Sequence, residues 1–115
     1  MFKWPLINNN ISQQDKRALS DFVLNTDRFT NGPKVKEFEK AWSDWLGIKH
    51  TVFVNSGASA NYIMASVLKE QKGLGEVIVP PIGWVSDIAP LVNLGFTPVF
   101  VDVDLKNMAI SADNI

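Results

Sequence analysis

Apolar residues recur at helical spacing near the start of the chain. Ser12 followed three residues later by Asp15 is typical of a helix start, because both side chains accept hydrogen bonds from free backbone N–H groups. From there a stripe of apolar positions continues to about Asn25, where a polar turn begins. The pattern predicts an amphipathic helix over residues 12–25.

A second amphipathic pattern follows over residues 33–46. Pro33 suits the first position of a helix, and Gly47 suits the position just after its end. Trp42 and Trp45 lie on the apolar face of this pattern, so we expect both to be core residues.

The rest of the chain alternates between short apolar runs and helical spacing, with glycines and prolines between them. Strands are predicted over residues 50–54, 76–79 and 98–103, and helices over residues 58–70 and 84–94. Pro90 falls inside the second of these helices and is expected to bend it. Strands that alternate with helices indicate the α/β class, in which a mainly parallel sheet has flanking helices.

The junction between the strand at residues 50–54 and the next helix is rich in small residues. Gly57 and Ala58 allow a ligand to approach the backbone closely, and a helix start offers free N–H groups and the positive end of the helix dipole. A phosphate group suits such a site. The alternative is structural, because a helix that follows a strand needs small residues and a cap such as Ser56.

Neither common nucleotide motif decides between these interpretations, because the chain contains no G-x-G-x-x-G and no G-x-x-x-x-G-K-[ST] pattern. The position of the loops favours a ligand site, since parallel sheets bind ligands beyond the carboxyl ends of their strands. Residues 56–59, residues 80–84 and Asp102 all fall at the carboxyl ends of predicted strands. We therefore expect them to converge on one crevice.

Composition excludes several classes of function. Hydrophobic residues make up 46% of the 115 residues, which suits a globular domain, and the net charge of −1 gives no reason to expect nucleic acid or an anionic membrane as a partner. The chain has no cysteine and a single histidine, His50, so thiolate chemistry and a histidine-based metal site are excluded. We expect no metal site and interpret His50 as a structural surface residue.

Neither a targeting signal nor a membrane span is expected. Residues 1–10 contain Pro5 and three consecutive asparagines and lack the apolar core of a signal peptide, which makes the cytoplasm the expected location. Residues 77–96 are the most apolar part of the chain, but they carry Asp87 and three prolines, which disfavours a membrane-spanning helix.

Four segments of the chain, taken in order, resemble the amino-terminal part of the DegT/DnrJ/EryC1/StrS sugar aminotransferases, which are pyridoxal-phosphate (PLP) enzymes of fold type I. These segments are residues 29–39, 55–61, 79–86 and 95–104, and their order and spacing agree with the family. The resemblance implies an amino-terminal helical segment at residues 1–28 and a truncated part of the PLP-binding large domain at residues 29–115.

The resemblance also implies roles for four residues. In such enzymes the backbone amides of the loop that matches Gly57, Ala58 and Ser59 hold the cofactor phosphate, and the Ser59 hydroxyl is a further donor. The family commonly has Thr or Ser where this chain has Ala58, so one side-chain hydrogen bond to the phosphate is expected to be lost. Trp84 matches the aromatic residue that stacks on the pyridine ring; the alternative is a core aromatic of the following helix.

Asp102 and Asp104 lie two residues apart at the end of a predicted strand, where both carboxylates can face the same side. Such a pair suggests a metal site. The family has the matching pair as a structural turn, so the resemblance implies neither a metal ligand nor a catalytic residue here, although Asp102 is left open as a neighbour of the cofactor.

The residues that perform PLP chemistry are not identifiable in the chain. That chemistry needs a lysine that forms a Schiff base with the cofactor, and usually a carboxylate for the pyridine nitrogen. None of the eleven Lys and Arg residues occupies the family's lysine motif. Since family members are several hundred residues long, we expect this chain to be an amino-terminal portion, and we assign it no catalytic residue.

Three functions remain open. The first is the amino-terminal portion of a nucleotide-sugar aminotransferase, whose full-length relatives use a nucleotide-linked sugar and an amino donor and form homodimers. The second is a related deoxysugar 3-dehydrase, in which a histidine replaces the lysine; the run of small residues that ends in Asn61 is closer to this branch. The third is a non-enzymatic binding or assembly module, since a piece of a larger sheet leaves an edge and an apolar face uncovered.

Overall fold

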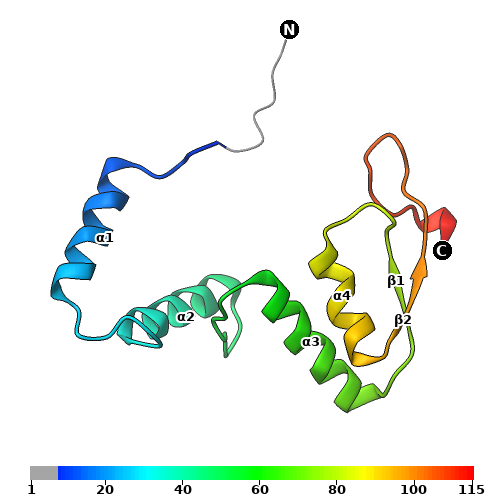
Figure 1. Cartoon of the computed structure of the whole chain (residues 1–115), viewed down its shortest axis with the longest axis horizontal. Coiled ribbons are helices and arrows are strands. Elements are labelled where there is room, and N and C mark those ends of the chain that lie inside the picture. Colours follow the sequence, from blue (N-terminus) through cyan, green and yellow to red (C-terminus); the bar gives the residue numbers. More distant parts are fainter. Residues whose placement is uncertain (1–7) are drawn as a thin grey trace, which may run out of the picture. The chain divides into compact units, whose positions relative to one another are not determined.

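The computed structural model describes residues 8–115 (Figure 1). These residues divide into two compact units, and the boundary lies between Phe53 and Val54. Residues 1–7, the beginning of the predicted amino-terminal segment and most of the stretch searched for a signal peptide, lie outside the described residues. Along residues 8–115, no helix combines the length and the apolar character needed to cross a bilayer.

Helix α1 (Gln13–Asn25) lies in the first unit, and local hydrogen bonds fix its start. The Ser12 hydroxyl accepts from the Asp15 N–H at 3.2 Å, and the Asp15 carboxylate accepts from the Ser12 N–H at 2.8 Å. Hydrogen bonds from the Ser12 hydroxyl and then from its N–H lower the pKa of Asp15. The carboxylate therefore stays charged where the helix dipole favours a negative charge. The predicted helix start is confirmed.

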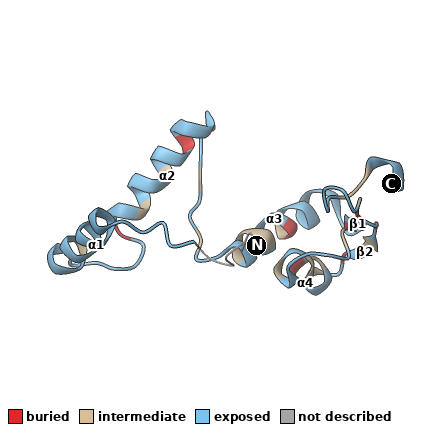
Figure 2. Cartoon of the chain, turned by 90° about the horizontal axis from the view of Figure 1, so that it is seen from above, coloured by how far each residue is buried: buried red, intermediate tan, exposed pale blue. Residues whose placement is uncertain are grey.

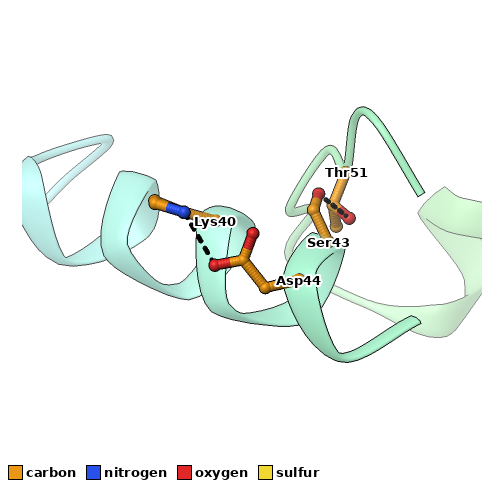
Figure 3. Close-up of polar contacts among 4 residues, drawn as sticks. All are labelled: Lys40, Ser43, Asp44 and Thr51. Atoms are coloured by element: carbon orange, nitrogen blue, oxygen red, sulfur yellow. Dashed lines mark hydrogen bonds and ion pairs between the residues drawn. The ribbon is translucent and has the colours of Figure 1, made fainter. Parts of the chain in front are cut away.

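Helix α2 (Pro33–Leu46) has the predicted bounds. Pro33 occupies its first turn, and Gly47 adopts a left-handed φ of 69° just after its end, where a residue without a Cβ is least strained. Ser43, a buried polar residue of this helix, shares a hydrogen bond of 2.7 Å with the Thr51 hydroxyl (Figure 3). This bond ties the segment after the helix back onto α2.

The prediction that Trp42 and Trp45 are core residues is wrong for this unit. Trp42 is 43% exposed and Trp45 is 73% exposed, and most residues of α1 and α2 are exposed (Figure 2). Aromatic rings on this face contact one another instead of a core. The Phe38 ring stacks on the Trp42 ring with centroids 5.8 Å apart, and it meets the Phe53 ring edge-on at 5.4 Å. In the described part of the unit no second layer covers this face of α2, so its apolar stripe stays exposed.

The predicted strand at residues 50–54 is not formed. The segment has no regular secondary structure, and the Phe53 N–H donates to the Glu39 carboxylate at 2.8 Å instead of to a neighbouring strand. A strand is stable only where another strand supplies its backbone partners, and none of the described residues does so here. The run of β-branched residues indicated a strand tendency but could not supply the partner.

The second unit is an α/β arrangement. Helix α3 (Gly57–Lys72) packs on helix α4 (Val85–Leu94), and α4 connects the parallel strands β1 (Glu76–Val79) and β2 (Thr97–Phe100). Parallel strands need such a crossover, because a tight turn can join only antiparallel neighbours. The predicted α/β class and the parallel pairing are thus both seen in this unit.

Strand β2 ends before the predicted limit at residue 103, because the chain leaves the sheet. The Val101 N–H still donates to the last carbonyl of β1 at 3.0 Å, whereas Val103 forms a single antiparallel bridge with Ile110. A short 3-10 helix, η1 (Ala112–Asn114), then follows Ser111, whose hydroxyl caps it by accepting from the Asp113 N–H at 3.3 Å.

The core of the second unit is small. Its buried hydrophobic residues are 4–8% exposed and come from α3, from β1 and from the chain on either side of β2; they are Ala65, Val79, Phe96, Val101 and Val103. Pro90 lies inside α4, as predicted, and is buried as well. Gly95 adopts a φ of 95° at the end of α4, which turns the chain so that Phe96 enters the core.

Candidate functional site

The four predicted site residues all lie in the second unit, at the starts of its two α-helices. Gly57, Ala58 and Ser59 form the first turn of α3, and Trp84 is the residue directly before α4. Helix α3 packs on α4, so the two parts of the predicted site belong to one packed pair of helices.

In the first turn of α3, the hydrogen-bond donors of Ser59 already have acceptors, whereas the backbone N–H groups of Gly57 and Ala58 have none among the described residues. The Ser56 hydroxyl caps the helix by accepting from the Ser59 N–H at 3.2 Å, and the Ser59 hydroxyl donates to the side-chain oxygen of Asn55 at 2.7 Å. Within residues 8–115, no hydrogen-bond acceptor meets the N–H groups of Gly57 and Ala58. Because a helix start carries partial positive charge, these two free donors suit an anion.

The approach to these donors is open. A Cβ placed on Gly57 would meet no atom within 4 Å. Ala58 and Ser59 line a hollow of about 450 Å³, and the first turn of α4 contributes Val85 and Ser86 to its other wall. The hollow therefore extends from the start of α3 to the residues that follow Trp84.

Trp84 does not behave as a core aromatic in this unit. It occupies the cap position of α4, its side chain makes no capping hydrogen bond, and it is 75% exposed. Cap positions favour Ser, Thr, Asp and Asn, so neither helix capping nor burial explains a tryptophan here. An exposed indole can stack on a flat heteroaromatic ring.

A side-chain contact links the two helix starts. The Asn61 amide donates to the Ser86 carbonyl at 3.2 Å and to the Asp87 carboxylate at 3.4 Å. Asn61 lies one helical turn after Gly57, and Ser86 lies two residues after Trp84. Sequence reasoning missed this link because the partners are 25 residues apart; the signal that was present is a proline inside α4.

Asp102 and Asp104 serve the turn that follows β2. The Asp102 carboxylate accepts from the N–H of its neighbour Val103 at 2.8 Å, and the Asp104 carboxylate accepts from the Lys106 N–H at 2.8 Å. Among the residues that the structure describes, no group of three or more His, Asp and Glu side chains is placed to hold a metal ion. Of the members of the predicted crevice, Ala58 and Ser59 line a hollow whose other wall begins directly after residues 80–84, whereas the Asp102 carboxylate accepts a hydrogen bond within its own turn.

A sequence profile of the DegT/DnrJ/EryC1/StrS aminotransferase family matches residues 9–115. The chain belongs to this family. The predicted resemblance is confirmed, and the match extends well beyond the four segments on which it was based.

Members of the family with two different activities are similar to this chain. GDP-4-keto-6-deoxy-D-mannose 3-dehydratase of Yersinia pseudotuberculosis is 32% identical over 121 residues, covering 100% of this chain and 30% of the relative. UDP-4-amino-4-deoxy-L-arabinose–oxoglutarate aminotransferase of Shewanella sediminis is 37% identical over 107 residues, covering 90% of this chain and 26% of the relative. The chain thus spans 30% or less of the length of these relatives, which confirms that it corresponds to only part of a family member.

The solved structure of GDP-4-keto-6-deoxy-D-mannose-3-dehydratase from Escherichia coli, which contains bound hydrated PLP, is similar to this chain with a TM-score of 0.83. The two are 30% identical, and the similarity covers 98% of this chain and 30% of that structure. The predicted fold, part of a PLP enzyme of fold type I, is confirmed.

Proposed function

We propose that this chain binds PLP and forms the phosphate- and ring-binding part of an enzyme that modifies nucleotide-linked sugars. The observation that carries the proposal is the pairing of two free helix-start donors with an exposed indole on one packed pair of helices. PLP presents a phosphate and a flat pyridine ring, so the two features match two parts of the same molecule. In this proposal residues 29–115 belong to the PLP-binding large domain and residues 1–28 precede it.

Each site residue has a separate role in the proposal. Gly57 and Ala58 donate their free N–H groups to the phosphate, and Ser59 adds its N–H and hydroxyl once these leave Ser56 and Asn55. Each hydrogen bond to a charged group contributes about 1.5–3 kcal/mol. Trp84 supplies the stacking face. When bound, PLP supplies an electron sink for bond breaking at a substrate carbon, and no residue of this chain is assigned a catalytic role.

Amino transfer to a nucleotide-linked sugar is the first candidate reaction, and 3-dehydration is the second. Relatives of both kinds support these candidates, because the aminotransferase has the higher identity, 37% over 90% of the chain, and the 3-dehydratase is 32% identical over the whole chain. The two differ in the residue that meets the cofactor, which is lysine in an aminotransferase and histidine in a dehydrase. Sequencing the gene beyond codon 115 tests this difference, because either residue would identify the branch.

A homodimer and a cytoplasmic location complete the proposal. Exposed apolar side chains support self-association, among them Phe38, Trp42 and Trp45 on α2. Among residues 8–115, the two-stranded sheet of the second unit also leaves a free edge on each strand. The cytoplasmic location is carried over from the expectation stated for the sequence.

Titration with PLP, followed by absorbance and tryptophan fluorescence, tests the proposed function. We expect weak, saturable binding that depends on the phosphate. Pyridoxal, which lacks the phosphate, is the matched ligand control, and its affinity should be at least about tenfold lower because it loses the charged hydrogen bonds. Equal affinity for the two compounds would contradict the phosphate site, and no binding of either would favour a non-enzymatic module.

Borohydride reduction of the PLP-saturated chain tests the absence of the cofactor lysine. We expect no single lysine to be labelled, since no lysine of the chain occupies the family's motif. Stoichiometric labelling of one lysine, located by peptide mass spectrometry, would contradict that assignment.

Trp84→Ala is expected to weaken PLP binding about two- to tenfold, because stacking contributes about 0.5–1.5 kcal/mol beyond area burial. The stability of the chain should change by less than about 0.5 kcal/mol, since Trp84 is 75% exposed. Trp45→Ala is the matched control, because Trp45 is 73% exposed and lies in the first unit. Equal PLP affinities of the two variants would contradict the stacking role.

A further inference from the structure

Pro90 leaves one carbonyl of α4 without its usual hydrogen-bond donor. In an α-helix the N–H of each residue donates to the carbonyl four residues earlier, and proline has no N–H. The Ser86 carbonyl is therefore deprived of the bond that residue 90 would otherwise make. Ser86 is half-buried and Pro90 is buried, so water reaches this part of the helix less easily than an exposed turn.

The side chain that meets this carbonyl comes from the other helix. Asn61 of α3 donates from Nδ2 to the Ser86 oxygen at 3.2 Å, and the same nitrogen lies 3.4 Å from a carboxylate oxygen of Asp87. A carboxamide nitrogen carries two N–H groups, so one side chain can serve both acceptors. Asn61 itself is half-buried, which limits exchange of these bonds for water.

We infer that Asn61 is a positioning residue, which replaces the hydrogen bond removed by Pro90 and thereby fixes the start of α4 against the start of α3. Asn61 lies four residues after Gly57, on the same face of α3. Its acceptor Ser86 lies two residues after Trp84. The bond thus sets the spacing between the phosphate donors and the stacking face; this consequence for the site rests on the proposed function.

The contact of Asn61 with α4 gives this residue a structural role. The small-residue run that ends in this asparagine resembles the dehydrase branch, which suggests a link with the reaction. The contact with Ser86 instead ties Asn61 to a proline inside a neighbouring helix. Asn61 thus serves the backbone of α4, whichever reaction the family member performs.

A double-mutant cycle on the full chain tests the pairing without any cofactor. Asn61→Ala should lower the folding equilibrium constant about three- to tenfold, because a half-buried carbonyl loses its donor. In Pro90→Ala, the N–H of residue 90 reaches the Ser86 carbonyl itself, so removing Asn61 should cost less than about twofold.

If Asn61→Ala lowers the folding equilibrium constant by the same factor in the wild type and in Pro90→Ala, the inference is overturned. Gln71→Ala, which removes an exposed amide near the other end of α3, is the matched control and should leave the equilibrium constant unchanged. Asn61→Asp keeps the side-chain size but places a carboxylate against the Ser86 carbonyl and the Asp87 carboxylate. Its folding equilibrium constant should therefore fall at least as much as that of Asn61→Ala. An Asp variant as stable as the wild type would overturn the inference even if Pro90→Ala does not fold.

PLP titration of the same variants tests the positioning role. Asn61→Ala should weaken PLP binding, and adding Pro90→Ala should restore most of the affinity, which a general loss of stability would not produce. A loss that Pro90→Ala does not restore contradicts the positioning role. If the wild type does not bind PLP, the proposed function and this role both fail, whereas the stability cycle still decides whether Asn61 and Pro90 are coupled.

Discussion

Ala58→Asp is expected to weaken PLP binding by about 100-fold or more while helix α3 stays folded. The new carboxylate would lie in the first turn of α3, beside the donors assigned to the phosphate. Two like unit charges 4 Å apart repel by about 4 kcal/mol at the effective dielectric constant of a protein surface, and a phosphate carries nearly two charges. The helix itself gains from the change, because a negative charge in its first turn contributes about 0.3–1 kcal/mol.

Opposite effects on binding and on stability make this variant informative. PLP affinity is measured by absorbance titration, and helix stability by circular dichroism during thermal unfolding. Ala58→Asn is the matched control, because it has nearly the same size as the Asp variant without the charge. If Ala58→Asp binds PLP as well as Ala58→Asn does, the phosphate does not bind at the start of α3.

The largest loss of stability is expected from Phe96→Ala. Phe96 is 6% exposed and belongs to the small core of the second unit. Removing a buried phenyl ring leaves a cavity and costs about 3 kcal/mol or more. Domains are stable by only about 5–15 kcal/mol, so this change is expected to bring a unit with so few buried residues close to unfolding.

Urea unfolding followed by circular dichroism measures this loss. Phe100→Ala removes the same atoms from the same segment of chain, but Phe100 is 58% exposed, so its loss should stay below about 1 kcal/mol. Similar losses in the two variants would show that Phe96 is not buried in solution as it is in the structure.

Helix ends could be predicted from the sequence because their signals are local. Ser12 caps α1 through a residue three positions away, and the two ends of α2 follow from Pro33 and Gly47 alone. The backbone restrictions of proline and glycine and the reach of a serine hydroxyl act within one turn. These signals need no knowledge of the rest of the fold.

Features that need a distant partner could not be predicted in the same way. Residues 50–54 have the composition of a strand, but no other strand lies beside them in the described part of the chain. Trp42 and Trp45 have the spacing of a buried face, but burial needs a covering layer. The sequence pattern indicates which structure a segment favours, but contacts with other parts of the chain decide whether the strand or the buried face forms.

The candidate site likewise combines features that depend on nearby residues with features that depend on distant ones. The free donors at Gly57 and Ala58 follow from a helix start rich in small residues, which is a local property. The stacking role proposed for Trp84 came from the family resemblance, and the exposure of its side chain is compatible with that proposal. The bond between Asn61 and Ser86 joins residues far apart in sequence, and only the structure shows it.

The capping of α3 by Ser56 affects the expected rate at which a phosphate dissociates from the proposed site. The Ser59 N–H already has the Ser56 hydroxyl as its acceptor, so at the proposed site an incoming phosphate oxygen would exchange one acceptor for another at that donor. In the proposed site the affinity gained at Ser59 would be the difference between two hydrogen bonds, and the full gain would arise only at Gly57 and Ala58. As a phosphate leaves the proposed site, the Ser56 hydroxyl would again accept from the Ser59 N–H, so this donor need not stay unpaired during release. Dissociation should therefore be faster than a count of three amide bonds implies.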